Sequence, residues 1–383
     1  MLASQRTLFD IPRDVCYLNA ASWSPLPLAV QEAGHTAIGN KGQPWKLPDD
    51  FAVTQNERAR KAAAALLNAD PFDVALIPSV GYGVATAAKI LSVPRGSRII
   101  VLENDHTSPV LEWIGRADAQ GFTVDTIKRG DDGDWTSAVL EAIDRKGAAP
   151  IALASISSVH WSDGGALDIT RIGAALKRHG AALLVDATHD VGIRRIDVTT
   201  LDPDFLIFPT YKWVLGPYGR AFIYVAKRHQ NGVPLEQTAG GRKHVVAEDT
   251  IYFRDVSYRE DARRYDMGER DFLISMQMAA TGMEMMARWG NDAIVGRLSM
   301  LTGRLADGLR NLKVTLLPQE FRAPHVLSIG FPNGMPDGLP QKLAAQRVYA
   351  AARLGRMRLS PHVYNDEEDV DRFVEAFRGA IDA

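Results

Sequence analysis

Two residues of opposite charge stand out in the middle of the chain, because each follows a short apolar run. Asp186 ends the run AALLVD, and Lys212 comes shortly after the run DFLIFP. A lysine amine can form a Schiff base with an aldehyde, and a carboxylate can keep a pyridine nitrogen protonated so that the ring accepts electrons. Pyridoxal 5′-phosphate (PLP) needs both groups. Either residue alone is typical of a surface position at a strand end. The pair, with Gly-Pro-Tyr-Gly close behind Lys212, predicts a PLP site.

The stretch IPSVGYGVATAAKIL predicts a place for the cofactor phosphate. It puts four residues at the junction of a strand and a helix: Ser79, Val80, Gly81 and Tyr82. Free backbone N–H groups and the helix dipole favour an anion at such a junction, and small residues let the anion approach closely. We therefore expect these four residues to bind the phosphate.

These residues need a scaffold, and the chain alternates short apolar runs with helical patterns. Such alternation predicts an α/β domain with a largely parallel sheet. In a sheet of this kind, function gathers beyond the carboxyl ends of the strands. The predicted strands are residues 73–78, 98–102, 150–156, 181–186, 204–208 and 221–225, and predicted helices include 79–91 and 169–179.

After about residue 230 the alternation of apolar runs and helical patterns gives way to a polar stretch. Long helical patterns cover residues 272–288 and 293–311, and the last part from 326 alternates strand and helix twice. At 383 residues the chain is too long for one compact core. We expect three parts: an N-terminal segment (1–29) that packs with the small domain, a large cofactor-binding domain (30–259) and a small C-terminal α+β domain (260–383).

The composition excludes several classes of function. The 44 basic and 46 acidic residues give a formal net charge of −2, which offers no electrostatic reason to bind nucleic acid or an anionic membrane. No stretch approaches the roughly 18 apolar residues that span a bilayer, and the first residues lack the apolar run of a secretory signal. The single cysteine, Cys16, rules out an internal disulfide and a cysteine-rich metal site. We expect a cytoplasmic protein that uses no metal.

Two linked patterns carry a resemblance to a known family. Asp-x-x-His-x-x-Gly at 186–192, followed by Tyr-Lys-Trp-x-x-Gly-Pro at 211–217, resembles the class V aminotransferase family of fold-type-I PLP enzymes. That family includes cysteine desulfurases, kynureninases and isopenicillin N epimerases. The resemblance runs from YLNAASWSPLP to RLSPHVYNDEEDVDRF, almost the whole chain. It implies a large domain with a mainly parallel sheet, a small C-terminal domain, and a homodimer with active sites at the interface.

The resemblance also implies roles for individual residues. Lys212 matches the Schiff-base lysine, and Asp186 matches the partner of the pyridinium nitrogen. His106, in LENDHTSP, matches a histidine that stacks on the pyridine ring, and His189 stands near the phenolic oxygen of the cofactor. Lys212, His106 and Asp186 are therefore the expected catalytic residues.

Other matches concern the phosphate and the substrate. Thr210 and Tyr211 resemble residues that reach the phosphate in kynureninases, and Ser158 matches a position that faces the cofactor oxygen. Arg358, in MRLSPHVYN, matches the arginine that grips the substrate α-carboxylate with two parallel hydrogen bonds. Asn19, in YLNAAS, resembles the N-terminal segment that folds over the substrate.

The chain departs from the family pattern in two places. Desulfurases use a cysteine nucleophile in the C-terminal part, where this chain has none, and Cys16 lies too near the N-terminus to replace it. The partner-chain motif that is often Glu-x-Gly-Thr reads Asp-Met-Gly-Glu at 266–269. Glu269 thus stands where a hydroxyl would bind phosphate, and Arg264 and Arg270 are the candidates to compensate.

The sequence leaves the reaction open. Loss of the Cα proton can lead to transamination, to epimerisation or to expulsion of a β-substituent. We expect an aminotransferase or β-lyase that acts on an amino acid, with an epimerase, a racemase or a kynureninase-like hydrolase as alternatives. A PLP-binding sensor without turnover is the alternative from another class, but Lys212, Asp186 and Arg358 together favour an enzyme. The polar stretch 240–270 is expected to reach the active site of a partner chain.

Overall fold

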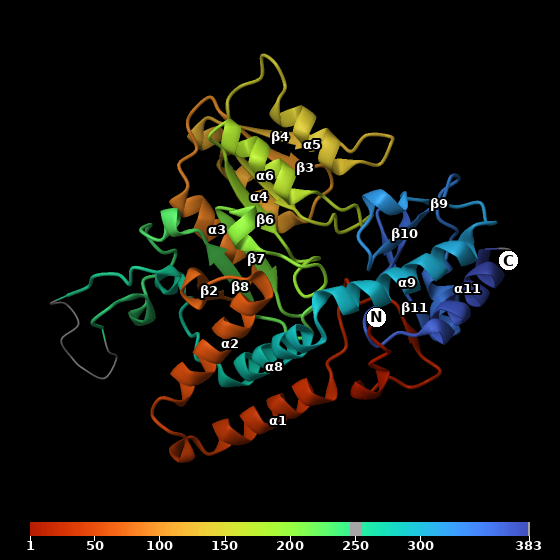
Figure 1. Ribbon diagram of the computed structural model, residues 1–383, viewed down its shortest axis with the longest axis horizontal. Helices are drawn as coiled ribbons and strands as arrows, with labels where there is room; N and C mark the ends of the chain where they lie inside the picture. The colour runs from red at the N-terminus through yellow and green to blue at the C-terminus, as the bar shows by residue number, and fades with distance from the viewer. Residues whose placement is uncertain (246–254, 382–383) are drawn as a thin grey trace.

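A seven-stranded sheet forms the centre of the larger part of the computed structural model, which describes residues 1–245 and 255–381 (Figure 1). The strand order is β2-β8-β7-β6-β5-β3-β4. All neighbouring strands are parallel except β8, which is antiparallel to β2 and β7. The predicted α/β fold is confirmed. The strands are β2 (Val74–Ile77), β3 (Arg98–Leu102), β4 (Thr123–Ile127), β5 (Ile151–Ser157), β6 (Ala182–Asp186), β7 (Phe205–Pro209) and β8 (Ala221–Val225).

The sheet is covered by helices on both faces, because its inner strands are apolar on both. In β3, Ile99 and Val101 belong to one buried cluster, and Ile100 and Leu102 belong to the other. Helices α3 and α4 pack on one face, and α2, α5 and α6 pack on the other. These helices are α2 (Phe51–Leu67), α3 (Val80–Ile90), α4 (Thr107–Gln120), α5 (Trp135–Ile143) and α6 (Ile169–Arg178), and a short α7 (Val198–Leu201) follows β6.

The C-terminal part begins with two consecutive helices and continues in a small antiparallel sheet. Helix α8 packs against α1 and α2, and α9 packs against the last helix, α11. The small sheet has the order β12-β13-β10-β9, and β1 pairs separately with β11. The division into residues 1–29, 30–259 and 260–383 stays a prediction. The elements are α1 (Leu28–Gly42), α8 (Leu273–Trp289), α9 (Asn291–Leu309), α10 (Leu339–Ala345), α11 (Glu367–Ile381), β1 (Cys16–Tyr17), β9 (Thr315–Leu316), β10 (Leu327–Gly330), β11 (Val348–Tyr349), β12 (Ala351–Arg353) and β13 (Arg356–Leu359).

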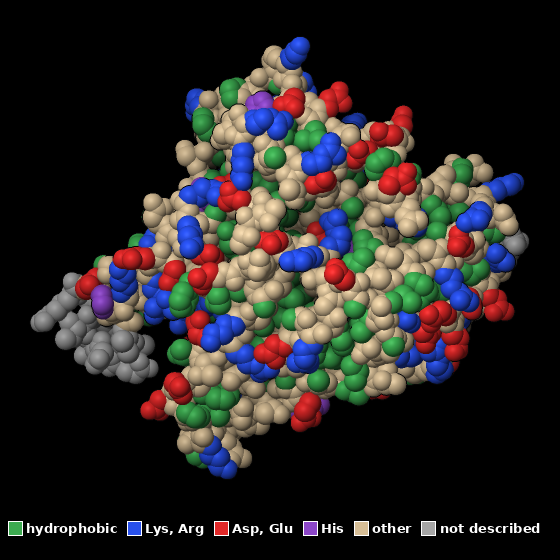
Figure 2. All heavy atoms as spheres, in the orientation of Figure 1, with side chains coloured by type: hydrophobic (Ala, Val, Ile, Leu, Met, Phe, Trp, Pro, Cys, Tyr) green, Lys and Arg blue, Asp and Glu red, His purple; other side chains and the backbone are tan. Residues whose placement is uncertain are grey.

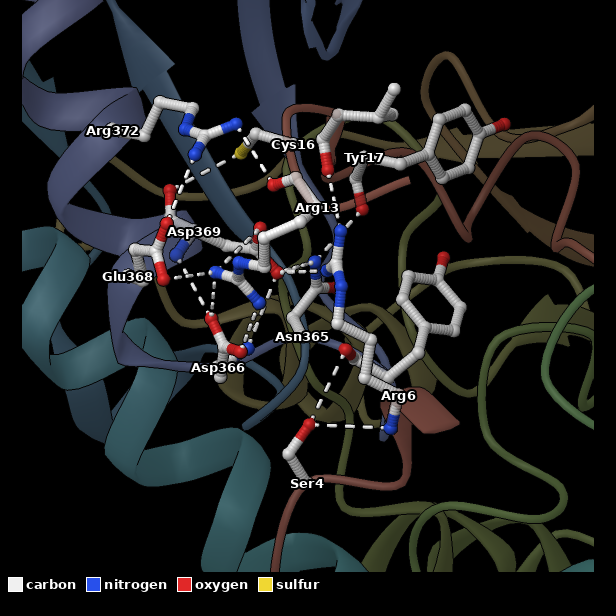
Figure 3. Close-up of polar contacts among 12 residues, drawn as sticks. Ser4, Arg6, Arg13, Cys16, Tyr17, Asn365, Asp366, Glu368, Asp369 and Arg372 are labelled. Atoms are coloured by element: carbon white, nitrogen blue, oxygen red, sulfur yellow. Dashed lines mark hydrogen bonds and ion pairs between the residues drawn. The ribbon is translucent and has the colours of Figure 1, made fainter. Parts of the chain in front are cut away.

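The start of the chain is tied to helix α11 by a cluster of polar contacts (Figure 3). Arg6 Nη1 lies 2.9 Å from Oδ2 of the buried Asp369, and Arg13 pairs with Asp366. The Cys16 thiol donates a hydrogen bond to the Asp369 carbonyl oxygen at 3.2 Å. Breaking one side of a buried ion pair costs about 3–5 kcal/mol. The cluster therefore fixes the N-terminal segment against the C-terminal helix.

On the face of the described residues that Figure 2 draws, charged side chains of both signs are mixed. None of the described helices is long and apolar enough to cross a membrane. Within residues 1–245 and 255–381, no three His, Cys, Asp or Glu side chains are grouped to hold a metal ion.

Candidate active site

A cavity of about 420 Å³ opens at the carboxyl ends of β2, β5, β6 and β7. Its volume is in the range of sites for small ligands, about 300–1,000 Å³. It brings together most of the residues predicted from the sequence. Those in its wall are Ser79, Val80, Gly81, His106, Asp186, His189, Tyr211 and Lys212. Those outside its wall are Asn19, Tyr82, Ser158 and Arg358.

Lys212 is buried, and its side chain meets His189. The Lys212 Nζ lies 3.2 Å from His189 Nε2, and the indole N–H of Trp213 donates to His189 Nδ1 at 3.0 Å. Because an indole N–H can only donate, His189 Nδ1 carries no proton and the neutral ring holds its proton on Nε2. Burial and the charge of Lys212 hold the pKa of His189 well below its usual value. His189 can therefore donate a hydrogen bond from Nε2–H to the Lys212 amine when that amine is neutral.

The pKa of Lys212 is far below that of an ordinary lysine. Burial lowers its pKa to about 7, the positive charges of Arg358 and Arg353 add to this effect, and Asp186 opposes it. An ordinary lysine has a pKa of roughly 10.4 and is charged at neutral pH. Above pH 7 the Lys212 amine is mostly uncharged, and in this form it can act as a nucleophile or a base.

Two further histidines, which were not predicted from the sequence, bind the backbone of His189 and Trp213. His325 Nε2 donates to the His189 carbonyl oxygen at 2.7 Å, and His362 Nε2 donates to the Trp213 carbonyl oxygen at 3.1 Å. Burial lowers the pKa of His325 to about 3 and that of His362 to about 4, so both rings are neutral. The Trp213 ring packs edge-on against His325 and stacks on His362. This neutral, buried wall fixes the backbone that carries Lys212.

Asp186 and His106 lie at different depths of the cavity. Asp186 is the buried last residue of β6, and its Oδ1 accepts the backbone N–H of Thr188 at 2.9 Å. His106 caps helix α4 at the exposed edge, with the Trp161 ring edge-on at 6.1 Å. Partial burial and the charge of Lys212 lower the pKa of His106. At neutral pH its imidazole is therefore able to accept a proton.

Asp105 holds the loop that carries His106 against β5. Its carboxylate accepts hydrogen bonds from the Ser157 hydroxyl at 2.7 Å and the Ser157 amide at 3.1 Å, and burial raises its pKa to about 6. Ser157 thereby lines the cavity, and Ser158 does not. Ser158 lines a different cavity of about 650 Å³, where Arg194 donates to its carbonyl oxygen. The predicted placement of Ser158 is corrected, because successive residues of a strand face opposite sides.

Helix α3 begins at the cavity and presents two amides there. The Ser79 hydroxyl accepts the Tyr82 amide at 3.1 Å, and the Ser79 carbonyl oxygen accepts the Gly83 amide at 3.2 Å. In the described part of the chain, the amides of Val80 and Gly81 have no acceptor, and both residues line the cavity. A Cβ atom added to Gly81 would meet nothing within 4 Å, so the space before this turn is open. The Tyr82 amide is not available to an anion, since it donates to the Ser79 hydroxyl.

Aromatic rings stand beside the lysine. Tyr211 stacks on Tyr218 with ring centroids 3.6 Å apart, and Trp23 of the N-terminal segment packs edge-on against Tyr218 at 5.0 Å. The Thr210 hydroxyl donates to the carbonyl oxygen of Pro217, so it is used within the loop and does not reach a phosphate. Tyr218 and Trp23 lie in the stretches Gly-Pro-Tyr-Gly and YLNAASWSPLP, but no role was predicted for either side chain.

Arg358 and Asn19 lie next to the cavity rather than in its wall. Arg358 is 1% exposed; its Nη1 donates to the Trp161 carbonyl oxygen at 2.5 Å and its Nη2 donates to Ser22 Oγ at 2.7 Å. Asn19 pairs with Ser360, and its Oδ1 is buried without a partner among the described residues. The N-terminal segment and strand β13 thus meet beside the cavity.

The segment predicted to reach a partner chain makes contacts within its own chain, although residues 246–254 lie outside the described residues. Arg264 donates to the carbonyl oxygens of Gly232 and Arg259, and Arg270 pairs with Asp266 at 2.6 Å. Both guanidinium groups are therefore already engaged. The structure gives no support to their replacing the hydroxyl that the family has at position 269.

The groups around the cavity fit PLP. The buried amine of Lys212 can meet an aldehyde, and the carboxylate of Asp186 can meet a pyridine nitrogen. The amides of Val80 and Gly81 lie at a helix N-terminus beside the open space at Gly81, and this arrangement favours a phosphate. The imidazole of His106 can lie against a ring. The donor set and the volume of the cavity thus agree with this cofactor.

A comparison with protein families decides which family this is. The family model for class-V aminotransferases matches residues 17–373. The chain belongs to the class-V aminotransferase family. Members of this family depend on PLP, so PLP is the cofactor of this protein and the protein is an enzyme.

Relatives of this class-V enzyme include aminotransferases and C–S lyases. It is 27% identical over 354 residues to an uncharacterized aminotransferase of Bacillus subtilis, which covers 92% of this chain and 89% of that one. It is 26% identical over 388 residues to a probable cysteine desulfurase of Pyrococcus abyssi, with 95% and 94% covered.

Solved structures share the fold of the class-V enzyme. The cysteine desulfurase of Thermococcus onnurineus has a TM-score of 0.85 over 100% of both chains at 22% identity. A cystine C–S lyase in complex with cysteine persulfide has a TM-score of 0.85 at 19% identity, with 95% of this chain and 97% of that chain covered. At these identities the likeness shows the fold alone. The family match and the curated relatives place the protein among PLP enzymes of the aminotransferase or C–S lyase type.

Proposed function

We propose that this enzyme uses Lys212 to remove the Cα proton of an amino acid and then completes a transamination or a β-elimination. The observation that carries the proposal is the buried Lys212 amine, whose pKa is about 7 and which lies beside the neutral His189. A general base works best when its pKa is close to the working pH. Lys212 can therefore take up a proton near neutral pH and return it to a different atom.

The residues that hold the cofactor in this proposal already line the cavity. Lys212 offers an amine for the aldehyde, Asp186 a carboxylate for the pyridine nitrogen, and Val80 and Gly81 their amides for the phosphate. When bound, PLP supplies an electron sink for the negative charge that develops at the substrate Cα. The chain itself places the substrate and moves the protons.

The two histidines of the cavity have different tasks. His189 holds its proton on Nε2, because Trp213 occupies Nδ1, and so it keeps an N–H donor beside Lys212. His106 is neutral at pH 7, because partial burial and Lys212 lower its pKa. It can lie against the cofactor ring without adding a charge, and it can accept a proton at the exposed edge.

A sulfur transfer that stores sulfur on a protein thiol is not part of the proposal. Cys16 is the single cysteine, and it is buried beneath α11 with its thiol on the Asp369 carbonyl oxygen. Burial and Asp369 raise its pKa, and only a thiolate is a good nucleophile. The chain thus offers proton removal at Cα without a thiol to receive sulfur, which favours transamination or loss of a β-substituent.

We also propose that the enzyme is a homodimer that works in the cytoplasm. Ile38, Trp45 and Val53, in and between α1 and α2, are exposed, and Figure 2 shows hydrophobic side chains at the surface along this edge. Exposed apolar groups that lie together mark interaction surfaces. Tyr218, in the cavity wall, is half exposed, which agrees with a second copy closing the site. A free cysteine fits a reducing compartment.

Hydrogen exchange at Cα tests the proposed proton removal without assuming the later steps. The holoenzyme is incubated in D₂O with each proteinogenic amino acid in both chiral forms, and Cα deuterium is measured by mass spectrometry. We expect exchange with at least one amino acid and none with Lys212→Ala. A keto acid formed without ammonia then identifies a transaminase, and a keto acid formed with ammonia identifies a lyase. No exchange with any amino acid would overturn the proposal.

A further inference from the structure

Two arginines of the hairpin β12–β13 converge on one hydroxyl of the N-terminal segment. Arg353 Nη2 lies 2.8 Å from Ser22 Oγ, and Arg358 Nη2 lies 2.7 Å from the same atom. The hairpin turn contains Leu354 and Gly355, with φ of 47° and 72°. Two successive residues of positive φ are typical of the tight turns that match the twist of a hairpin. Both arginines therefore project from a regular element, which holds a binding group more rigidly than a loop does.

The hydrogen bonds of Arg358 show which of its atoms can take a ligand. Its Nη1 is held by the Trp161 carbonyl oxygen, and its Nη2 donates to Ser22 Oγ. Its Nε is buried and has no partner in the described chain. The Nε–Nη2 edge of a guanidinium matches the two oxygens of a carboxylate. On this edge, Nε has no acceptor among the described residues, and Nη2 donates to the Ser22 hydroxyl, which a carboxylate oxygen can replace.

The charges at this place also favour an anion. The hydrogen bonds of Arg353 go to Ser22 and to the Ala352 carbonyl oxygen, and neither Arg353 nor Arg358 has a carboxylate partner among the described residues. Burial and the nearby charge of Arg353 lower the pKa of Arg358 to about 9. Two positive charges this close repel each other, and an anion between them would turn the repulsion into attraction.

Building on the proposed function, we propose that Arg353 is a second carboxylate-binding residue of the active site and that Ser22 Oγ holds the place of one substrate carboxylate oxygen. The carboxylate takes two hydrogen bonds from Nε and Nη2 of Arg358 and a third from Nη2 of Arg353. Ser22 gives way to the incoming oxygen. A site of this kind selects amino acids with a free α-carboxylate and rejects amines, amides and esters, which would leave buried donors unpaired.

Binding of propionate to the holoenzyme tests the proposal, with propionamide as the uncharged control and calorimetry as the measurement. Arg353→Gln should weaken propionate binding about tenfold or more, which is the effect of losing one charge-assisted hydrogen bond. Measured well above the pKa of Lys212, where the amine is neutral with or without the charge of Arg353, the dissociation constant of the cofactor should stay unchanged. Ser22→Ala should strengthen propionate binding, because no hydroxyl competes for the donors. Arg347→Gln is the matched control, since Arg347 is an exposed arginine paired with Asp14, and it should change neither value.

Three results would overturn the proposal. Wild-type protein that does not prefer propionate to propionamide has no carboxylate site here. If Arg353→Gln binds propionate as tightly as the wild type does, Arg353 does not bind the carboxylate. If Ser22→Ala weakens propionate binding, the Ser22 hydroxyl binds the carboxylate and does not occupy the position of one of its oxygens. This variant tests the proposal even if Arg353→Gln does not fold. The measurement needs no turnover, so a wild type that shows these propionate effects but no Cα exchange would sink the proposed function alone.

Discussion

Replacing Trp213 by phenylalanine should raise the pKa of Lys212, although the indole does not bind the lysine. The connection runs through His189, whose Nδ1 accepts the Trp213 N–H at 3.0 Å and whose Nε2 lies 3.2 Å from Lys212 Nζ. Phenylalanine keeps most of the ring packing but cannot donate. The His189 proton can then move to Nδ1, and Nε2 becomes an acceptor that stabilises the charged form of Lys212.

The size of the effect follows from two opposing costs. A hydrogen bond to a charged group contributes about 1.5–3 kcal/mol, and a buried N–H without an acceptor costs about 1–3 kcal/mol. A bond at the strong end of its range, about 3 kcal/mol, and a cost of about 2 kcal/mol leave about 1 kcal/mol in favour of the ammonium, and one pKa unit is about 1.4 kcal/mol. The pKa of Lys212 should therefore rise from about 7 to nearly 8. At pH 7 this lowers the neutral fraction of the amine about three- to fivefold, and well above pH 8 it changes little.

The assay is the rate at which the cofactor-free protein takes up PLP, followed by absorbance across a pH series. The neutral amine attacks the aldehyde, so the wild-type rate should rise with pH through about 7. The profile of Trp213→Phe should have the same shape with a higher midpoint. His189→Gln is the matched background, because a glutamine amide donates to Lys212 and has no tautomer to lose. There, Trp213→Phe should leave the midpoint nearly unchanged.

An equally large shift in the His189→Gln background would refute the reasoning, because the effect would then not pass through the imidazole. An unchanged midpoint in Trp213→Phe alone would show that His189 keeps its Nε2 proton without the indole. Thermal denaturation of all four proteins measures the packing that is lost, and a uniform loss of stability does not move the midpoint of the uptake rate.

Other experiments test the remaining groups. Borohydride should fix PLP to Lys212 in the wild type and not in Lys212→Ala, and peptide mapping to another lysine would contradict the assignment. Asp186→Ala should still take up PLP but lose Cα exchange at least about a hundredfold, because nothing keeps the pyridine nitrogen protonated; near-normal exchange would give this task to another residue. Arg358→Lys should weaken propionate roughly ten- to hundredfold, since an ammonium cannot form the two-point contact, and an unchanged dissociation constant would exclude it. Light scattering should show a dimer, and a fully active monomer would argue against a shared site.

The central strands could be predicted because they are buried on both faces. Residues 98–102 and 221–225 match β3 and β8, and the other four predicted strands agree to within one residue at each end. Strand β4 was missed. It is the edge strand of the sheet, and its sequence TVDTI is partly exposed, so it lacks the continuous apolar run that marked the others.

The site was predictable where one motif places one residue, and not where the three-dimensional arrangement decides. Asp186 ends strand β6 and Lys212 follows strand β7, so their convergence could be predicted from the parallel sheet. The family resemblance predicts Ser158 as the cavity residue, but strand β5 ends at Ser157, and it is Ser157 that faces the cavity. His325 contacts a residue far away in the sequence, at the carbonyl oxygen of His189, and no local pattern indicates such a contact.

The carboxylate site and the lysine are electrically connected. The pKa of Lys212 is low because of burial and because of the charges of Arg358 and Arg353, the two residues on which a substrate carboxylate would rest. Without a carboxylate, the amine is mostly neutral above pH 7 and suits attack on an aldehyde. A bound carboxylate offsets the arginine charges, so the amine holds a proton more firmly, which suits the acceptance of the Cα proton. The neutral His189 adds no charge in either state. Under this reasoning, the α-carboxylate that amino acids share adjusts Lys212 from nucleophile to base.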